Sequence, residues 1–128
     1  MTEYHSREFV EALHAEQLRL HGGAPGIRDE GMLESALYRP QQREIYGEPD
    51  LCELASAYLF GIAKNHPFVD GNKRTAFAAA DLFLYFNGLS IEAEQEDIIQ
   101  LVMMVAAGEI DEAGAAAFFR DHVVRIED

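Results

Sequence analysis

The fold that we expect for this chain is decided by one segment, Asn72-Lys73-Arg74-Thr75-Ala76-Phe77-Ala78-Ala79-Ala80-Asp81-Leu82-Phe83-Leu84-Tyr85-Phe86-Asn87-Gly88. Its apolar residues leave almost no polar face on a helix, and Asn87-Gly88 is a typical helix stop. A helix that is apolar on nearly all sides is usually the buried central one. We therefore expect a helical protein built around residues 72–87.

Helical periodicity continues on both sides of this segment. It predicts a helix over residues 6–20, stopped by the glycines at 22–26, and a short one over 29–37, ended by Pro40. Asp50 is expected to cap a third helix, and two more fit residues 96–107 and 111–124. Residues 89–91 fit a short extended piece, and the polar residues 41–49 fit a surface loop or small flap. The prediction is an all-α bundle of about six helices.

Length and composition restrict the protein class. A chain of 128 residues is one domain, residues 1–128, and it is long enough to fold without disulfides or metal. Its longest apolar stretch, Ala76–Phe86, is too short for a bilayer and contains Asp81. The first residues lack the pattern of a signal peptide, and the one cysteine, Cys52, excludes a disulfide framework. We expect a soluble protein of the cytoplasm, without membrane contact.

The charge balance is strongly acidic. The chain has 10 Lys and Arg against 23 Asp and Glu, a formal net charge of −13. Such a surface repels nucleic acid and anionic lipid at long range, so direct nucleic-acid binding is not expected. The acidity fits either a small basic partner or a contribution to solubility alone.

One stretch departs from the rules of local structure, Asn65-His66-Pro67-Phe68-Val69-Asp70-Gly71-Asn72-Lys73-Arg74-Thr75. Pro67 disfavours helix at His66, whereas Asp70, Gly71 and Asn72 are turn and capping residues. The pattern predicts a loop that ends where the central helix begins. A helix N-terminus presents free N–H groups and a positive dipole end, which together bind anions.

Two cations at the start of the central helix support an anion site. Lys73 and Arg74 oppose the helix dipole there, at a cost of about 0.3–1 kcal/mol each. The chain has only two lysines, Lys64 and Lys73, and both flank the loop. A docked anion turns this cost into an advantage, and Gly71 lets a phosphate approach the backbone.

His66 and Asp70 add chemical groups to this site. The pKa of histidine suits proton transfer near neutrality, and Mg²⁺ commonly takes one or two carboxylates plus phosphate oxygens. A base, a metal ligand and a phosphate clamp are the parts of phosphoryl or nucleotidyl transfer. The residues alone leave open whether the loop is catalytic or only binds an anion.

At these residues the chain resembles the Fic/Doc superfamily. The shared Fic pattern is H-P-F-x-[D/E]-G-N-[G/K]-R, and residues 66–74 fit it at every fixed position. The run from Gly26 to Leu37, and on to Pro40, is similar to the start of death-on-curing (Doc) toxins. The resemblance covers nearly the whole chain and implies a Fic-like helical fold and a toxin of a type II toxin–antitoxin system.

Two departures from the adenylylating Fic branch point to the Doc branch. Those enzymes usually carry Gly where this chain has Lys73, and a second Arg where it has Phe77. The resemblance to Doc implies a protein kinase that uses ATP and Mg²⁺ and transfers the γ-phosphoryl group to a Ser or Thr hydroxyl. The target associated with the branch is elongation factor Tu, so arrest of translation is implied. A Fic-type adenylyltransferase and a non-catalytic binding module remain the alternatives.

The resemblance also implies roles for the catalytic residues His66, Asp70 and Arg74. His66 is the base that takes the hydroxyl proton, and Asp70 is the Mg²⁺ ligand. Arg74 grips a phosphate of the nucleotide.

The remaining positions of the pattern are implied to bind the nucleotide phosphates. Gly71 and Asn72 supply the anion-binding turn, and Lys73 joins Arg74 in gripping phosphates. Phe68 is expected to pack under the loop and anchor it.

The resemblance finally implies how the protein is controlled and where its target docks. Many Fic proteins carry an inhibitory helix with the pattern [S/T]-x-x-x-E-[G/N]. The nearest string here, Ser90 to Glu94, is followed by Gln95, so we read it as chance and expect a small Phd-like antitoxin in trans. The loop over residues 41–49 is placed where the family has a flap that docks the target.

For the other histidines and the lone thiol we expect structural roles. His14 and His21 are read as solvated or capping, and His5 and His122 as having no specific role. Cys52 is expected in the core.

Three further surface features carry no chemistry in this interpretation. Met103-Met104 is read as core in preference to a partner groove. Arg39 is read as a surface arginine that assists the site only as a second choice. An acidic patch is expected to be a solvated face and helix start; it comprises Glu92, Glu94, Glu96 and Asp97.

Overall fold

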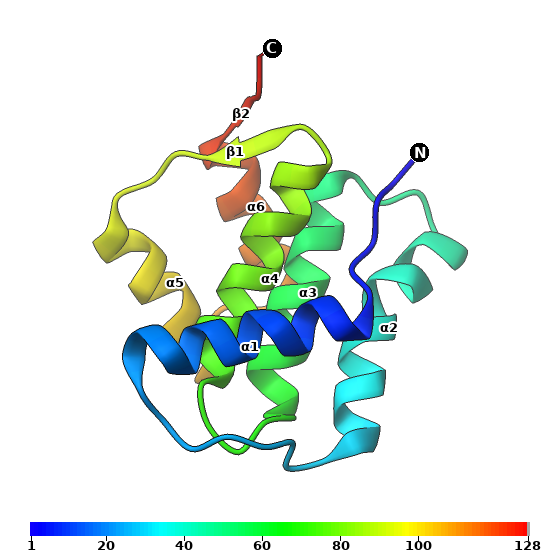
Figure 1. Ribbon diagram of the computed structural model, residues 1–128. Coiled ribbons are helices and arrows are strands. Elements are labelled where there is room, and N and C mark those ends of the chain that lie inside the picture. The colour runs from blue at the N-terminus through cyan, green and yellow to red at the C-terminus, as the bar shows by residue number, and fades with distance from the viewer. Residues whose placement is uncertain (128) are drawn as a thin grey trace.

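Six helices and one pair of short strands make up residues 1–127 in the computed structural model, which describes those residues (Figure 1). The helices are α1 (Arg7–His21), α2 (Glu30–Ile45), α3 (Leu51–Asn65), α4 (Asn72–Phe86), α5 (Gln95–Ala106) and α6 (Glu112–His122). The strands are β1 (Leu89–Ile91) and β2 (Val123–Arg125), paired antiparallel. The predicted all-α fold class is confirmed. Among these residues, no helix is both long enough and apolar enough to span a bilayer.

Four of the helices begin at a side chain that caps them. Ser6, Asp29, Asp50 and Asp111 each accept a hydrogen bond from a backbone N–H in the first turn of α1, α2, α3 and α6. Asp50 forms a full capping box, because the Glu53 side chain accepts a hydrogen bond from the backbone N–H of Asp50. The predicted cap at Asp50 is thus confirmed, and the helix starts are encoded locally.

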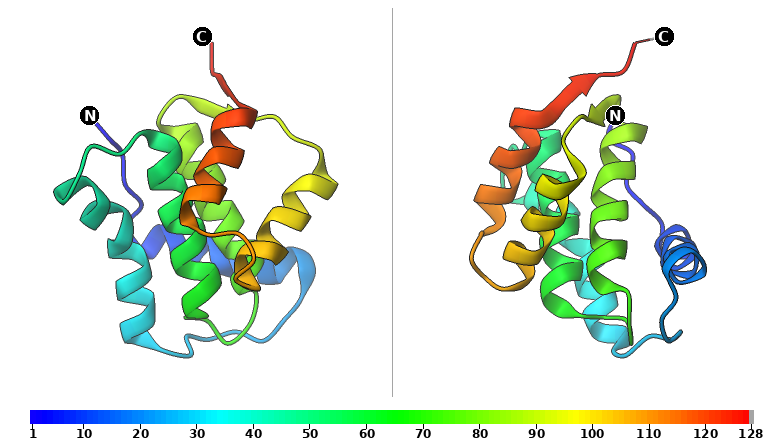
Figure 2. Two further views of the ribbon diagram at one scale, coloured as in Figure 1. Left: turned by 180° about the vertical axis from the view of Figure 1, so that it is seen from behind. Right: turned by 90° about the vertical axis from the view of Figure 1, so that its left-hand side faces the viewer.

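The helices form layers around α3 and α4. These two helices pack along each other, α2 packs against α3, and α1 crosses α4. Figure 2 shows α1 on one side of the α3–α4 pair and α5 and α6 on the other. Ten of the 15 residues of α3 are buried, whereas α4 buries one face and leaves Tyr85 and Phe86 exposed. The prediction of residues 72–87 as a buried central helix holds for that face, and α3 shares the centre.

Close packing at the centre needs small residues as well as large ones. Tyr58, Phe83 and Phe119 are fully buried and fill the space between the helices. Gly61 lets α3 approach α2 closely, because a Cβ placed there meets the backbone of Ala36 at 3.3 Å. The two helices therefore pack nearly backbone to backbone at this point.

The segment predicted as a loop or flap over residues 41–49 is helical as far as Ile45, so the prediction was wrong for residues 41–45 and holds for residues 46–49. α2 passes through Pro40 and continues to Ile45, where Tyr46 donates to the carbonyl of Gln42. Pro40 is buried and removes one helical hydrogen bond without ending the helix. An ion pair between Arg43 and Glu112 on α6 holds the end of α2 from outside the helix.

The C-terminal helix is shorter than predicted. α6 ends at His122, whose Nδ1 lies 2.7 Å from the carbonyl oxygen of Phe118, and Val123 continues as β2. Pairing of Val123 with Ile91 places β2 beside β1, which confirms the extended piece at residues 89–91. The β-branched residues at 123 and 124 favour a strand once a partner strand is available.

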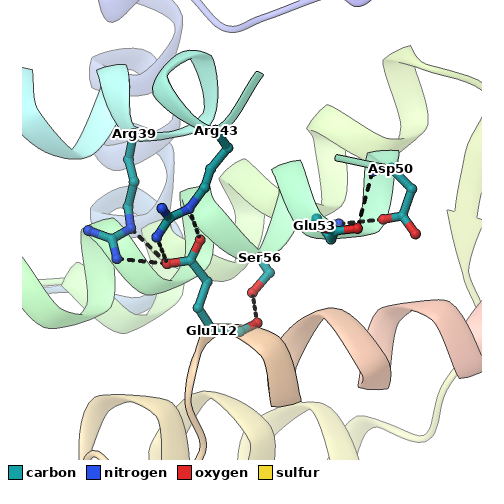
Figure 3. Close-up of polar contacts among 6 residues, drawn as sticks. All are labelled: Arg39, Arg43, Asp50, Glu53, Ser56 and Glu112. Carbon is teal, nitrogen blue, oxygen red and sulfur yellow. Dashed lines mark hydrogen bonds and ion pairs between the residues drawn. The ribbon is translucent and has the colours of Figure 1, made fainter. Parts of the chain in front are cut away.

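Glu112 joins three helices through polar contacts (Figure 3). It lies in the first turn of α6 and accepts hydrogen bonds from Arg39 Nε at 2.9 Å and Arg43 Nε at 2.7 Å, both on α2. Its backbone carbonyl accepts a bond from Ser56 Oγ on α3. The Arg39 guanidinium also lies 5.0 Å from the ring centre of Phe60. Arg39 is therefore part of the scaffold and does not belong to the site.

The ion pairs determine the charge state of Glu112. Burial acts to raise the pKa of its carboxyl group, but the hydrogen bonds from Arg43 and Arg39 outweigh burial and leave the pKa below its ordinary value. A depressed pKa in the fold stabilises the protein above the unfolded pKa, and this stabilisation is lost as the pH falls through the folded pKa.

We predict that Glu112→Gln lowers the free energy of unfolding by about 2 kcal/mol at pH 7, because hydrogen bonds to a charged acceptor are lost. Urea denaturation measures the loss. The difference from the wild type should shrink as the pH falls through the folded pKa of this carboxyl group, which lies below its ordinary value, because the group is then protonated in both states.

The matched control is Glu16→Gln, which breaks the exposed pair of Glu16 with Arg19. This variant should leave the free energy of unfolding close to that of the wild type, because solvent screens an exposed ion pair. An equal loss in both variants, or a loss for Glu112→Gln that does not depend on pH, would contradict the role assigned to Glu112.

Candidate active site

The connection between α3 and α4, residues 66–71, is bounded by two residues in the left-handed region. His66 ends α3 with φ 48° and ψ 55°, and Gly71 precedes α4 with φ 76° and ψ 17°. Within residues 1–127, His66 is the one non-glycine residue with positive φ. This conformation costs an L-residue about 1–2 kcal/mol, so the surrounding contacts must hold it.

The side chain of Asn72 closes the connection from inside. Its Oδ1 accepts a bond from the backbone N–H of Phe68 at 2.9 Å, and its Nδ2 donates to the Phe68 carbonyl at 2.9 Å. The Phe68 ring is 1% exposed, which confirms that it packs under the loop. Asn72 thus uses its side chain to shape the turn, and only its backbone N–H is left for the predicted role in anion binding.

His14 supports the same loop from α1, so the expectation of a solvated or capping histidine was wrong. It is 6% exposed, and its ring stacks on Phe68 with 3.8 Å between ring centres and 8° between planes. Its Nε2 lies 2.8 Å from the carbonyl oxygen of Asp70. No spacing signal in α1 indicated this contact, because it depends on how α1 crosses the start of α4.

His5 was also read wrongly, as a histidine without a specific role. Its Nε2 lies 2.7 Å from the carbonyl oxygen of Ala79, and its ring packs near Phe9 and Tyr58. His5 therefore fixes the N-terminal segment on α4, at a distance from the connection along that helix.

The segment that runs beside the connection is residues 26–29, not residues 41–49. Its Ile27 forms an antiparallel bridge with Phe68, and the N–H of Val69 donates to the carbonyl of Gly26. The N–H groups of Arg28 and Asp29 both donate to the carbonyl of Pro67. The connections α1–α2 and α3–α4 thus lie side by side at one end of the molecule (Figures 1 and 2).

Asp70 is exposed, and each oxygen of its carboxylate accepts one hydrogen bond from the backbone. Its Oδ1 accepts from the N–H of Gly71 at 2.9 Å, and its Oδ2 accepts from the N–H of Ala24 at 3.2 Å. Each oxygen keeps a free lone pair. Within residues 1–127, no group of three His, Cys, Asp or Glu side chains is placed to hold a metal ion. Asp70 therefore fits Mg²⁺ held by one carboxylate together with phosphate oxygens, and not an all-protein metal cage.

The cations at this end of the molecule are free. Among residues 1–127, no carboxylate lies within 4.0 Å of Lys64, Lys73 or Arg74. Carboxylates instead pair with five arginines elsewhere: Arg7, Arg19, Arg39, Arg43 and Arg120. α4 also has no side-chain cap, in contrast to the four capped helices above. A positively charged helix start without partners is a site for an anion.

The six predicted site residues are therefore brought together by one short connection and the first turn of α4. His66, Asp70, Lys73 and Arg74 are exposed, and Gly71 and Asn72 are partly buried. An exposed imidazole at one end and a cationic helix start at the other can serve proton transfer beside a bound phosphate.

We predict that Asn72→Ala lowers the free energy of unfolding by about 1–2 kcal/mol, because two neutral hydrogen bonds to Phe68 are lost. Chemical denaturation measures the loss. The comparison variant is Asn65→Ala, which removes a single amide bond to the carbonyl of Met32 and should cost less. A smaller loss for Asn72→Ala than for Asn65→Ala would contradict this account of the loop.

Comparisons with known proteins identify the family of the chain. The Fic/DOC family profile matches residues 4–84, which contain α1 to α3, the connection and most of α4. The protein named Toxin Doc from Mycolicibacterium smegmatis is 46% identical over 97 residues, covering 73% of this chain and 72% of that protein. The protein named Protein kinase doc from Escherichia phage P1 is 38% identical over 116 residues, covering 90% of this chain and 91% of that protein.

The resemblance seen in the sequence is thus confirmed, for the Doc branch as well as for the superfamily. The family profile matches more than half of the chain, and two relatives above 30% identity cover most of it. The chain therefore belongs to the Fic/DOC family.

Proposed function

We propose that this protein is a Doc toxin that acts as a protein kinase, transferring the γ-phosphoryl group of ATP to a Ser or Thr hydroxyl of a translation factor. The observation that carries the proposal is the exposed His66 beside an uncapped helix start whose cations have no acidic partner. The names of the two relatives, a toxin and a protein kinase, agree with it. Elongation factor Tu is the candidate target, and arrest of translation is the expected outcome.

The proposed reaction assigns one role to each end of the connection. The hydroxyl oxygen of the target forms a bond to the γ-phosphorus, the bond from that phosphorus to the bridging oxygen breaks, and ADP leaves. His66 accepts the hydroxyl proton on a ring nitrogen. The first N–H groups of α4, with Lys73 and Arg74, stabilise the negative charge on the phosphates.

Asp70 is the residue that would hold Mg²⁺. The chemistry that Mg²⁺ would supply there is neutralisation of the charge on the nucleotide phosphates. Because Asp70 also accepts bonds from Ala24 and Gly71, its carboxylate is already oriented before a metal arrives.

Two side chains favour phosphoryl over adenylyl transfer. Lys73 fills the first turn of α4 with a charged side chain where adenylylating Fic enzymes have Gly. Phe77, one turn further and partly buried, replaces a second phosphate-binding Arg. Residue 73 therefore leaves less space for an adenylyl group, and residue 77 lacks the second arginine that would bind its phosphate.

We also propose control by a small Phd-like antitoxin in trans. The string Ser90 to Glu94 contributes to β1 and the turn after it, and it does not form a helix. It is thus unsuited to act as an inhibitory helix of the Fic kind. Failure of the protein to bind any small product of a neighbouring gene would count against this proposal.

We predict that label moves to a bacterial target from γ-labelled ATP and not from α-labelled ATP. Purified protein is incubated with lysate and either nucleotide, and the labelled proteins are separated on a gel. Label from the α-position would identify an adenylyltransferase and would contradict the assignment of Lys73 and Phe77.

The control for catalysis is a pair of histidine variants. His66→Ala should remove transfer and toxicity while the fold is retained, because the proposed reaction assigns the hydroxyl proton to this imidazole, and His66 is the one histidine within residues 66–71. His122→Ala, near β2, should keep both. A toxic and active His66→Ala protein would disprove the role of His66 as the base.

A further inference from the structure

We propose that Arg28 is a positioning residue that holds the backbone of His66 in its left-handed conformation and so directs the imidazole. The expected effect on kcat rests on the proposed kinase function. The expected effect on the backbone of His66 does not. No feature of the sequence pattern around Arg28 assigns it a role.

Arg28 binds three consecutive carbonyl groups, one at the end of α3 and two in the connection. Its Nε donates to the carbonyl of His66 at 2.6 Å, and its Nη2 donates to the carbonyl of Asn65 at 2.8 Å. Its own backbone N–H donates to the carbonyl of Pro67 at 2.7 Å. Within residues 1–127, no carboxylate pairs with Arg28, so its guanidinium is committed to this backbone.

These bonds act on the torsion angles that define the strained residue. The N–H of His66 donates to the carbonyl of Ile62, which ties the residue to the last turn of α3. The direction of the His66 carbonyl is set by ψ, and Arg28 fixes that carbonyl from the other side. The next residue, Pro67, disfavours the right-handed helical region at His66. Together, these contacts hold His66 in the left-handed conformation.

The chemistry of the arginine side chain suits this task. The last carbonyls of α3 carry the negative end of the helix dipole, which a cation stabilises. A guanidinium is planar and donates in fixed directions, so it holds two neighbouring carbonyls at once, whereas an ammonium group is a point charge. Charge alone is therefore expected to replace only part of the function of Arg28.

Release of this contact should affect the base and spare the nucleotide site. If His66 relaxes to negative φ, its Cβ turns and the imidazole leaves its place beside the phosphate cradle. The helix start with Lys73 and Arg74 is held separately, by Asn72 and His14. The turnover number should fall, and the KM for ATP should stay unchanged.

The experiment compares Arg28→Gln, Arg28→Lys and the control Arg125→Gln. Arg125 is exposed on β2, beyond the far end of α4, about 22 Å along that helix from the connection. Backbone chemical shifts of His66 in isotope-labelled protein report the sign of its φ without any need for activity. Steady-state kinetics of phosphoryl transfer give kcat and KM separately.

We expect Arg28→Gln to move His66 out of the left-handed region and to lower kcat about 100-fold, with an unchanged KM for ATP. Arg28→Lys should give an intermediate kcat, and Arg125→Gln should match the wild type. Three results would overturn the proposal. In folded Arg28→Gln protein these are a left-handed His66 or a rise in the KM for ATP as large as the fall in kcat. In Arg28→Lys it is a kcat equal to that of the wild type. A wild-type protein without kinase activity would instead disprove the proposed function, and the chemical shifts would still test Arg28.

Discussion

The six residues 66–71 have to reverse the chain between two helices that pack along each other. Such a short connection leaves little conformational choice, so both of its ends take left-handed residues, His66 and Gly71. Every other contact at this end follows from that constraint. Asn72 spans the turn, Phe68 fills the space beneath it, and the backbone of residues 26–29 bonds to that of residues 67–69. The end of one helix and the start of the next are thereby brought to the same place.

This placement uses opposite helix ends for different tasks. The carbonyl end of α3 carries the imidazole and is held by a cation, Arg28. The amide end of α4 carries Lys73 and Arg74, which the helix dipole disfavours until an anion arrives. Under the proposed function, a bound phosphate would restore the free energy that these two side chains cost in the empty protein. Stability and binding would then be in opposition at this turn, as is common for functional sites.

Local rules predicted the helix starts and the motif well, because capping and turn chemistry depend on neighbouring residues. Asp50 and the turn at residues 70–72 are of this kind. The rules failed where distant contacts decide. α2 continues past Pro40 while Arg43 binds Glu112 on α6, and Val123 becomes a strand only beside β1. The supporting residues His14 and Arg28 could not be found from spacing, because the crossing of α1 and the pairing of two connections bring them to the loop.

Among residues 1–127, Lys64, Lys73 and Arg74 have no carboxylate partner and lie at one end of an otherwise acidic chain, which under the proposed function affects how a nucleotide would approach. At low ionic strength, where the Debye length reaches about 30 Å, a polyphosphate would meet a body of net charge −13 and be repelled while it is still far from the helix start. Only close to that helix start would the local field of Lys64, Lys73 and Arg74 attract it. Added salt weakens both fields, but the longer-ranged repulsion is screened first. The rate of encounter should therefore pass through a maximum as ionic strength rises, the reverse of the steady decline seen when charges steer a ligand from far away.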